Sequence, residues 1–273
     1  MALILSVMMS GCGKQETEAS TDETAKGEAA DSVIIETGNT VTSYLTGKQV
    51  DESIGRFRPI SVMFNNVEAG CPQTGISRAD VVYEAPLASN TTRLIGIIED
   101  WHDLEKIGSI RSTRDYYVSF ALEFDAIHVH FGQATAYVGD MLNSDLVDNI
   151  SGRVAGIDSP ADNAFYRTDD RKAPHNLYAS AEGIMEDIQK FEYNLNYDES
   201  YYGKFKFAKD GEDLDYSKYP DATLMYPGGK ETGKPNGFSN VGSCFKYNEA
   251  DGKYYHYQYG AEHIDDMTGE QLA

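Results

Sequence analysis

Continuous and alternating apolar residues predict several short strands in the first half of the folded region. "RPISVMFNN" (58–66) contains a short, mostly apolar segment at 59–64, which predicts a strand. "DAIHVHFG" (125–132) alternates apolar and polar positions, which also predicts a strand. The predicted strands of this half are 59–64, 80–85, 92–99 and 125–132.

A helical period appears after the third of these strands. Tyr117, Phe120, Ala121 and Phe124 follow the i, i+3, i+4, i+7 pattern of one apolar helix face. Ser112 is the expected N-cap of this helix, with Asp115 three residues later. Two further helices are predicted at 134–147 and at 180–191, the second capped by Ser180.

The pattern changes after about Asn194, where aromatic and polar residues begin to alternate. "SCFKYNEADGKYYHYQYG" (243–260) predicts a β-hairpin with its turn at Asp251-Gly252. A mixed αβ region (56–194) therefore precedes a β-rich region (195–273), which indicates the α+β class. We expect the β-rich region to be incomplete at its C-terminal end.

The first residues resemble a bacterial lipoprotein signal. An apolar run, Ala2–Met9, leads into Ser10-Gly11-Cys12, a small-residue cleavage context followed by cysteine. Residues 1–12 are thus interpreted as a signal peptide, and Cys12 as the site of lipid attachment. Residues 13–55 begin with an acidic, Ser/Thr-rich stretch that we interpret as a flexible tether. The alternative is a buried N-terminal helix.

The net charge of the chain argues against nucleic acid as a partner. The 273 residues contain 23 Lys+Arg against 44 Asp+Glu, a formal net charge of −21. Nucleic-acid binding needs a broad basic surface, so we expect none.

Of the three cysteines, Cys71 and Cys244 form an even pair if Cys12 is lipidated; a disulfide between them and two separate thiols are both compatible with the sequence.

Positive charge gathers nevertheless at "GSIRSTR" (108–114). A helix N-terminus offers free amides and a positive dipole end, and arginines there are unfavourable unless an anion is nearby. The anion is either a ligand, such as phosphate or a carboxylate, or an internal acid: Asp115, Glu105 or Glu84. The candidate ligand-binding residues are Arg93, Ser109, Arg111, Ser112, Thr113, Arg114, Arg171, His175 and Asn176, with Arg167 a further polar candidate.

No complete catalytic or metal-binding motif is present. His128 and His130 share one face of a strand but lack further ligands of recognisable spacing, so no metal or cofactor is expected. "GGKETGKP" (228–235) departs from a phosphate-binding loop because Pro235 replaces the Ser/Thr that binds magnesium. No catalytic residue is assigned, although Glu84 and His130 are the candidates for an acid or base.

Several ordered motifs together resemble the YerB-like family of bacterial lipoproteins, a domain family of unknown function. They are "RPISVMFNN", "PQTGISRADVVYEA", "TRLIGIIED", "IGSIRSTRDYY", "AIHVHFG" and "RKAPHNLYAS", and they cover about Arg58 to Ser180. The resemblance implies a lipid-anchored extracytoplasmic protein that stacks mixed and antiparallel β-sheets with helices packed outside, and that continues past Ala273. Cys71 departs from the family's usual arginine, and Asn90-Thr91 from its usual two glycines. The matching positions are Gln73, Gly75, Asp80, Glu84, Arg93, Gly108, Arg111, Ser112, Arg114, His130, Pro174, His175 and Asn176.

These observations favour a non-catalytic binding protein, anchored to the cell membrane through Cys12 on its extracytoplasmic face. Its expected ligand is a small anion or a glycan, held in a local anion-recognising cleft. Two alternatives remain open. One is a hydrolase of envelope polymers that uses Glu84 or His130; the other is a module that binds an envelope protein through the tyrosine-rich second half.

Overall fold

The computed structural model describes residues 38–87, 91–209, 212, 214–227 and 237–273. Cys12 and the glycine-rich segment 228–235 lie outside these residues. Gly38–Ala273 form one compact unit. Among the described residues, no helix is long and apolar enough to cross a membrane.

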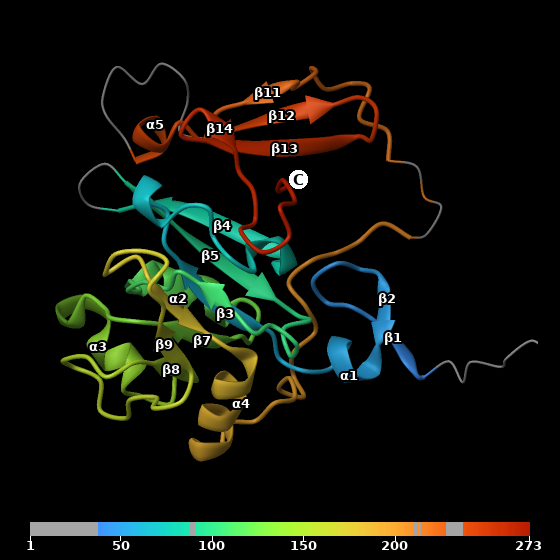
Figure 1. Ribbon diagram of the computed structural model, residues 1–273. Helices are drawn as coiled ribbons and strands as arrows, with labels where there is room; N and C mark the ends of the chain where they lie inside the picture. Colours follow the sequence, from blue (N-terminus) through green and yellow to red (C-terminus); the bar gives the residue numbers. More distant parts are fainter. Residues whose placement is uncertain (1–37, 88–90, 210–211, 213, 228–236) are drawn as a thin grey trace, which may run out of the picture. The chain divides into compact units, whose positions relative to one another are not determined.

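A five-stranded mixed sheet lies at the centre of this unit (Figure 1). Its strand order is β4-β5-β3-β7-β8. β3 pairs antiparallel with β5 and parallel with β7, so the sheet changes direction at β3. The bounds are β3 (Ile60–Phe64), β4 (Val81–Pro86), β5 (Thr92–Ile98), β7 (Ile127–His130) and β8 (Asn149–Ser151), which confirm the four predicted strands and add β8.

Helices cover both faces of this sheet. α4 (Ala181–Lys190) packs on the face that contains Ile60 and Val62, and α2 (Asp115–Leu122) packs on the face that contains Met63. α3 (Thr135–Leu142) packs against α2 and is shorter than predicted.

The predicted helix caps have different outcomes. Ser180 caps α4 as expected, because its Oγ accepts a hydrogen bond from the amide of Gly183 at 3.2 Å. The prediction for α2 was wrong: its N-cap is Arg114, with no side-chain capping bond, because the Ser112 hydroxyl instead donates to the Phe131 carbonyl.

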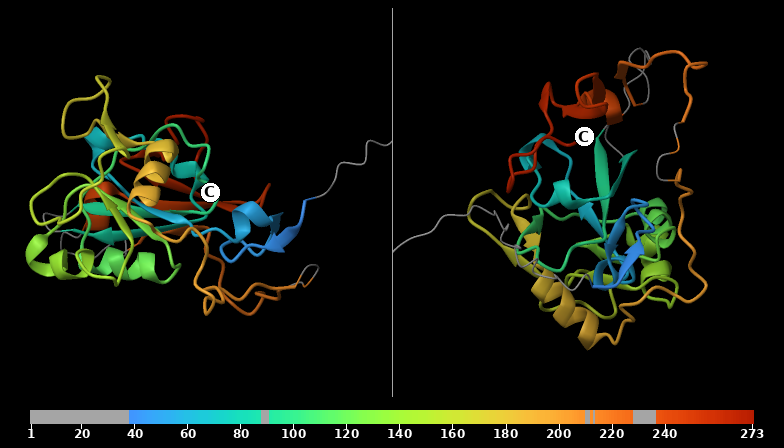
Figure 2. Two further views of the ribbon diagram at one scale, coloured as in Figure 1. Left: turned by 90° about the horizontal axis from the view of Figure 1, so that it is seen from below. Right: turned by 90° about the vertical axis from the view of Figure 1, so that its right-hand side faces the viewer.

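Three smaller sheets surround the central one, so the α+β class with mixed and antiparallel sheets is confirmed. The predicted hairpin is β12–β13, and its turn lies between Asn248 and Lys253 as expected. The sheet that contains it lies at the end of the unit remote from α4 (Figure 2). The sheets are β6 (Ile107–Gly108), β10 (Leu177–Ala179) and β9 (Phe165–Arg167); β11 (Leu224–Met225), β12 (Cys244–Asn248), β13 (Lys253–Gln258) and β14 (Ala261–Glu262); and β1 (Thr40–Thr42) with β2 (Gln49–Asp51).

Short helices complete the unit, and one lies in the range assigned to the tether. Residues 38–55 form β1, β2 and the helix α1 (Glu52–Gly55), so part of that range is folded rather than flexible. Residues 38–55 contain few apolar side chains, but one of them, Leu45, packs with Ile95 and Ile97 in the core. The other short helices are η1 (Glu68–Gly70), η2 (Ile76–Arg78) and α5 (Gly237–Val241).

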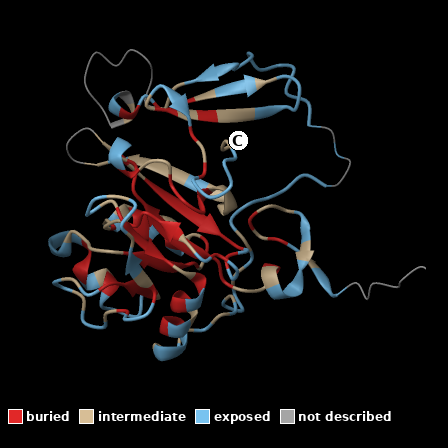
Figure 3. Ribbon diagram, in the orientation of Figure 1, coloured by how far each residue is buried: buried red, intermediate tan, exposed pale blue. Residues whose placement is uncertain are grey.

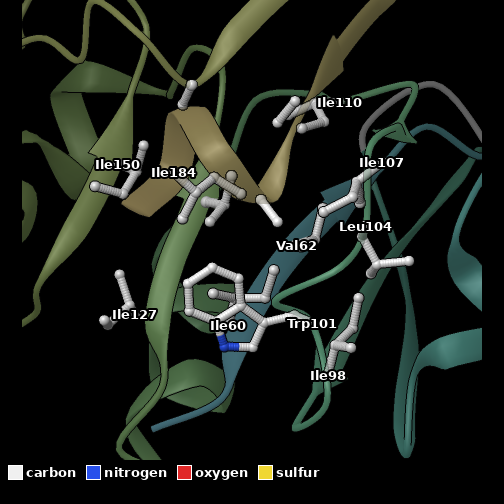
Figure 4. Close-up of a cluster of buried hydrophobic side chains, with 14 of the residues drawn as sticks. Ile60, Val62, Ile98, Trp101, Leu104, Ile107, Ile110, Ile127, Ile150 and Ile184 are labelled. Atoms are coloured by element: carbon white, nitrogen blue, oxygen red, sulfur yellow. The ribbon is translucent and has the colours of Figure 1, made fainter. Parts of the chain in front are cut away.

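The principal core lies between the central sheet and α4. All five side chains of β3 are buried, and buried residues concentrate along the central strands (Figure 3). Trp101 is fully buried beside Ile60, Ile98 and Val62 (Figure 4). Its indole nitrogen donates to the Arg58 carbonyl at 3.3 Å, so its polar edge is also satisfied.

A buried carboxylate ties α4 to the loop before β9. Asp187 is fully buried and accepts bonds from the backbone amides of Asp162, Asn163 and Ala164 at 3.1, 3.0 and 2.7 Å. It also accepts from the Asn163 side chain at 3.1 Å. The carboxylate therefore satisfies the polar groups of a loop that would otherwise be buried without partners.

We expect Asp187→Asn to destabilise the protein by about 1.5–3 kcal/mol, because an amide NH2 group would face backbone N–H donors. Urea unfolding measures this change in the free energy of unfolding. Glu186→Gln, one position earlier and exposed, is the matched control and should leave stability within about 0.5 kcal/mol. Equal effects of the two substitutions would contradict the assignment.

Candidate anion-binding site

The segment before α2 lies across the carboxyl ends of the parallel strands β3 and β7. The Arg111 amide donates to the Met63 carbonyl at 2.9 Å, and the Arg111 carbonyl accepts from the Phe131 amide at 3.0 Å. The Thr113 amide donates to the Gly132 carbonyl at 2.9 Å. Open α/β sheets commonly bind ligands at the carboxyl edge of their parallel strands, and the parallel strands of this mixed sheet provide an edge of the same kind.

Four arginines approach one another at this edge. Arg93 extends from β5 and donates to the Ser112 carbonyl, close to the start of α2. Burial, then the nearby Arg114 and Arg111 charges, lower the pKa of Arg93 to about 10. Burial and the charge of Arg167 lower the pKa of Arg111. We call Arg93, Arg111, Arg114 and Arg167 the arginine cluster.

His175 adds a neutral donor beside the cluster. Its Nδ1 accepts from the Arg111 guanidinium at 3.0 Å and from the Asn65 side chain at 2.9 Å. Because Nδ1 accepts two bonds, the proton of the neutral ring lies on Nε2. Burial, with the charges of Arg111 and Arg171, lowers the pKa of His175 and keeps it neutral.

No acid neutralises the arginine cluster among the described residues. The ion pairs among these residues are all formed by lysines and arginines outside the cluster. None of them joins a guanidinium group of the cluster to an Asp or Glu within 4.0 Å. Asp115 and Glu105, two of the internal partners considered above, form no ion pair with these guanidinium groups. Glu84 bonds to Asn66, Thr92 and Ser243 instead. The internal ion-pair explanation thus has no support from the described part of the chain.

Three of the expected donors serve the fold rather than the cluster. Ser109 is fully buried, and its Oγ accepts from the Asn65 side chain at 3.2 Å. The Thr113 hydroxyl bonds to His128 Nε2 at 2.8 Å, inside the core. Ser112 donates to a backbone carbonyl and contributes its own carbonyl to Arg93.

Arg171 and Asn176 are also engaged elsewhere. Arg171 donates to the carbonyls of Gly70 and Pro72 at 2.9 and 2.8 Å and pairs with Asp266 at 3.4 Å, so it fastens the C-terminal segment. Asn176 is buried; its Oδ1 accepts from Arg167 at 2.8 Å. Asn176 therefore positions a member of the cluster.

The two strand histidines are packed in the core. His130 is fully buried, its pKa is lowered to about 4 by burial, and its ring stacks on that of His128 at 5.1 Å. The described residues contain no group of three His, Cys, Asp or Glu side chains arranged for a metal ion. Cys71 and Cys244 are free thiols.

A cavity lies elsewhere in the described part of the chain. It has a volume of about 780 Å³ and lies against β4 and β13, where Glu84, His256 and His263 contribute to its wall. The arginine cluster is not part of this lining, so the cluster is a site at the strand ends and not in this cavity.

The family model for the N-terminal domain of DUF3048, a protein of unknown function, matches residues 45–194. The chain belongs to the DUF3048 family. The matched range includes the whole arginine cluster and His175. It ends at the boundary expected between the mixed αβ region and the β-rich region, although both regions lie in one compact unit.

Two comparisons with Bacillus subtilis YerB support this membership. The chain is 32% identical over 160 residues to YerB of strain 168, named there as a candidate lipoprotein; the match covers 59% of this chain and 46% of YerB. The crystal structure of YerB matches with a TM-score of 0.65 and 25% identity, over 85% of this chain and 72% of that one. The chain thus aligns with less than half the length of its curated relative, and the YerB-like resemblance is confirmed.

We expect Arg111→Gln to raise the pKa of His175 toward its ordinary value of 6.5, because a neighbouring cation is removed. An NMR titration of the imidazole measures this. A lowered histidine pKa contributes stability above pH 6.5, and this contribution is lost as pH falls. The decrease in the free energy of unfolding between neutral and acidic pH should therefore be smaller in the variant. Arg153→Gln, exposed and paired with Asp162, is the charge-matched control; an equal shift there would contradict the contact.

Proposed function

We propose that this protein is a non-catalytic binding protein that recognises one small anionic group at the arginine cluster. The observation that supports the proposal most is the absence of a neutralising acid around four clustered arginines within the described residues, in a chain of net charge −21. Like charges held together raise the free energy of the folded state. A bound anion would offset this cost.

The chemistry of the cluster favours phosphate or carboxylate. Guanidinium groups bind either anion through paired, charge-assisted hydrogen bonds. His175 Nε2–H and the first amides of α2, which has no capping side chain, would add neutral donors. The overall negative charge repels long polyanions, so the ligand is a small molecule or a single charged group of a glycan.

We also propose attachment to the extracytoplasmic face of the membrane through a lipid on Cys12. Support comes from the small-residue context Ser10-Gly11-Cys12, and from the similarity to a relative that is itself named as a candidate lipoprotein. The envelope-hydrolase alternative has less support. Glu84 and His130, its candidate acid and base, both have hydrogen-bonding partners inside the protein.

The anion proposal predicts that inorganic phosphate raises the melting temperature of the protein above its value in chloride of equal ionic strength. Arg111→Gln and Arg114→Gln should each weaken phosphate binding by about tenfold or more, since one charge-assisted bond contributes about 1.5–3 kcal/mol. Titration calorimetry measures the affinity, and acetate tests the carboxylate alternative.

Arg153→Gln removes the same charge from an exposed, paired position and should leave phosphate binding unchanged. Equal stabilisation of the parent protein, Arg111→Gln and Arg114→Gln by phosphate would contradict a site at the cluster. So would a parent protein that neither phosphate nor acetate stabilises.

The anchor proposal predicts that Cys12→Ala abolishes incorporation of labelled fatty acid and releases the protein from the membrane fraction in a bacterial host. Cys71→Ala is the control, because that thiol lies within the folded unit. Labelling that persists in Cys12→Ala would disprove the anchor.

A further inference from the structure

A closed ring of hydrogen-bonded side chains joins the central sheet to the sheet formed by β12, β13 and β14. Its members come from the end of β3, from the segment between η1 and η2, from β4 and from the C-terminal third of the chain, and they lie up to 190 residues apart in sequence. Around the ring the contacts are Glu84 Oε2–Ser243 Oγ 2.8 Å, Ser243 Oγ–His256 Nε2 2.8 Å, His256 Nδ1–His263 Nδ1 2.7 Å, His263 Nε2–Gln73 Oε1 2.7 Å, Gln73 Nε2–Asn66 Oδ1 3.1 Å and Asn66 Nδ2–Glu84 Oε1 3.2 Å.

Most side chains of the ring are buried, so the stability of the protein depends on where the hydrogens of the ring lie. Gln73, Asn66, Ser243 and His263 are at most 2% exposed, and His256 is 6% exposed. Two acceptors, or two donors, that face each other without a hydrogen between them are costly in such surroundings. Each contact in the ring therefore needs one hydrogen.

Backbone groups determine the orientation of the two amides. Gln73 Nε2 donates to the Asn65 carbonyl at 2.8 Å, and that oxygen can only accept, so Gln73 Oε1 is the atom that faces His263. Gln73 Nε2 also faces Asn66 Oδ1, which leaves Asn66 Nδ2 to donate to Glu84 and to Thr92. With these orientations, both contacts that lead from Gln73 through Asn66 to Glu84 have a hydrogen.

The other side of the ring lacks one hydrogen. Four contacts lead from Glu84 through Ser243, His256 and His263 to Gln73. Ser243 and two neutral histidines supply one hydrogen each, three in all, and Gln73 Oε1 supplies none. With an ionised carboxylate at Glu84, one contact would have no hydrogen.

We infer that Glu84, half-buried at the edge of this ring, is a proton-binding site: its protonated Oε2 donates to Ser243, and this proton completes the ring that fastens the β12–β14 sheet to the central sheet. The directions then follow. Ser243 donates to His256 Nε2, His256 Nδ1–H donates to His263 Nδ1, and His263 Nε2–H donates to Gln73. Glu84 Oε1 remains an acceptor for Thr92 and Asn66.

The surroundings favour the proton on Glu84 over an imidazolium. Burial raises the pKa of Glu84, although bonds from Thr92 and Ser243 oppose this. Burial lowers the pKa of His256 to about 4 and that of His263 to about 3. No described cation forms an ion pair with Glu84.

The titratable groups on neighbouring elements do not supply a compensating charge. Burial raises the pKa values of Tyr117 on α2, Tyr259 after β13 and Cys71 beside Gln73, so all three are neutral near pH 7. The adjoining cavity adds Asp80, Lys253 and Glu270 at its wall. Lys253 is exposed and makes no ion pair with Glu84.

The pH dependence has a defined sign. The pKa of Glu84 is higher in the folded than in the unfolded protein, so its contribution to stability is complete below its ordinary value of 4.5. That contribution is lost as pH rises through the folded pKa. The two histidines act oppositely, because their lowered pKa values cost stability as pH falls below 6.5.

Glu84→Gln tests the inference, because the amide reproduces the protonated acid: its NH2 donates to Ser243 and its oxygen still accepts from Thr92. We expect the unfolding constant of the parent protein, divided by that of the variant, to rise by up to tenfold per pH unit above pH 4.5 until Glu84 ionises. The histidine effects occur in both proteins and cancel in this ratio. A ratio that is constant from pH 5 to 8 would overturn the inference.

Nitrogen-15 NMR of the parent protein provides a second, independent measurement at pH 6. We expect neutral His256 with its proton on Nδ1 and neutral His263 with its proton on Nε2. An imidazolium at either position would overturn the inference, even if Glu84→Gln failed to fold. Glu262→Gln, exposed on β14, is the control for charge removal and should keep the parent protein's pH dependence.

Discussion

The complete burial of β3 is the constraint on which both polar networks depend. Asn65 and Asn66 follow this strand directly and are themselves buried, so their amide groups must find partners inside the protein. Asn65 bonds to His175 beside the arginine cluster, and its carbonyl orients Gln73. Asn66 belongs to the ring that contains Glu84. One peptide unit at the end of one strand therefore separates the candidate ligand site from the ring.

These neighbouring networks solve the problem of buried polarity in opposite ways. In the ring, every group is paired and the carboxyl group is neutralised by a proton, which suits a structural fastening. In the arginine cluster, charge of one sign accumulates and the described residues provide no counter-charge. This uncompensated positive charge at the carboxyl edge of the sheet is the basis on which we propose a ligand there.

Local patterns in the sequence were sufficient for the longer strands and helices of the fold and insufficient for its short elements and for the networks. The apolar run of β3, the helical period of α2 and the cap at Ser180 depend on neighbouring residues, and the structure contains all three. Ser112 does not cap α2, because a tertiary partner, the Phe131 carbonyl, competes for its hydroxyl. The ring was not foreseen, since Gln73, Glu84 and His263 meet only through long-range pairing. The sequence pointed to Arg93, Arg111, Arg114 and His175, which the structure brings together, and to Arg171, which it uses elsewhere.

The wide sequence separation within the ring has a consequence for the order of folding. The β4–β5 and β12–β13 hairpins join residues close in the chain, so their closure costs little conformational entropy. The parallel β3–β7 pairing joins residues 67 positions apart, and the contact between Gln73 and His263 spans 190. Contacts that close such long loops form late in folding. We therefore expect the β12–β14 sheet to dock after the central sheet has assembled, and a newly made chain to expose the face around Glu84 to solvent until β13 and β14 have emerged.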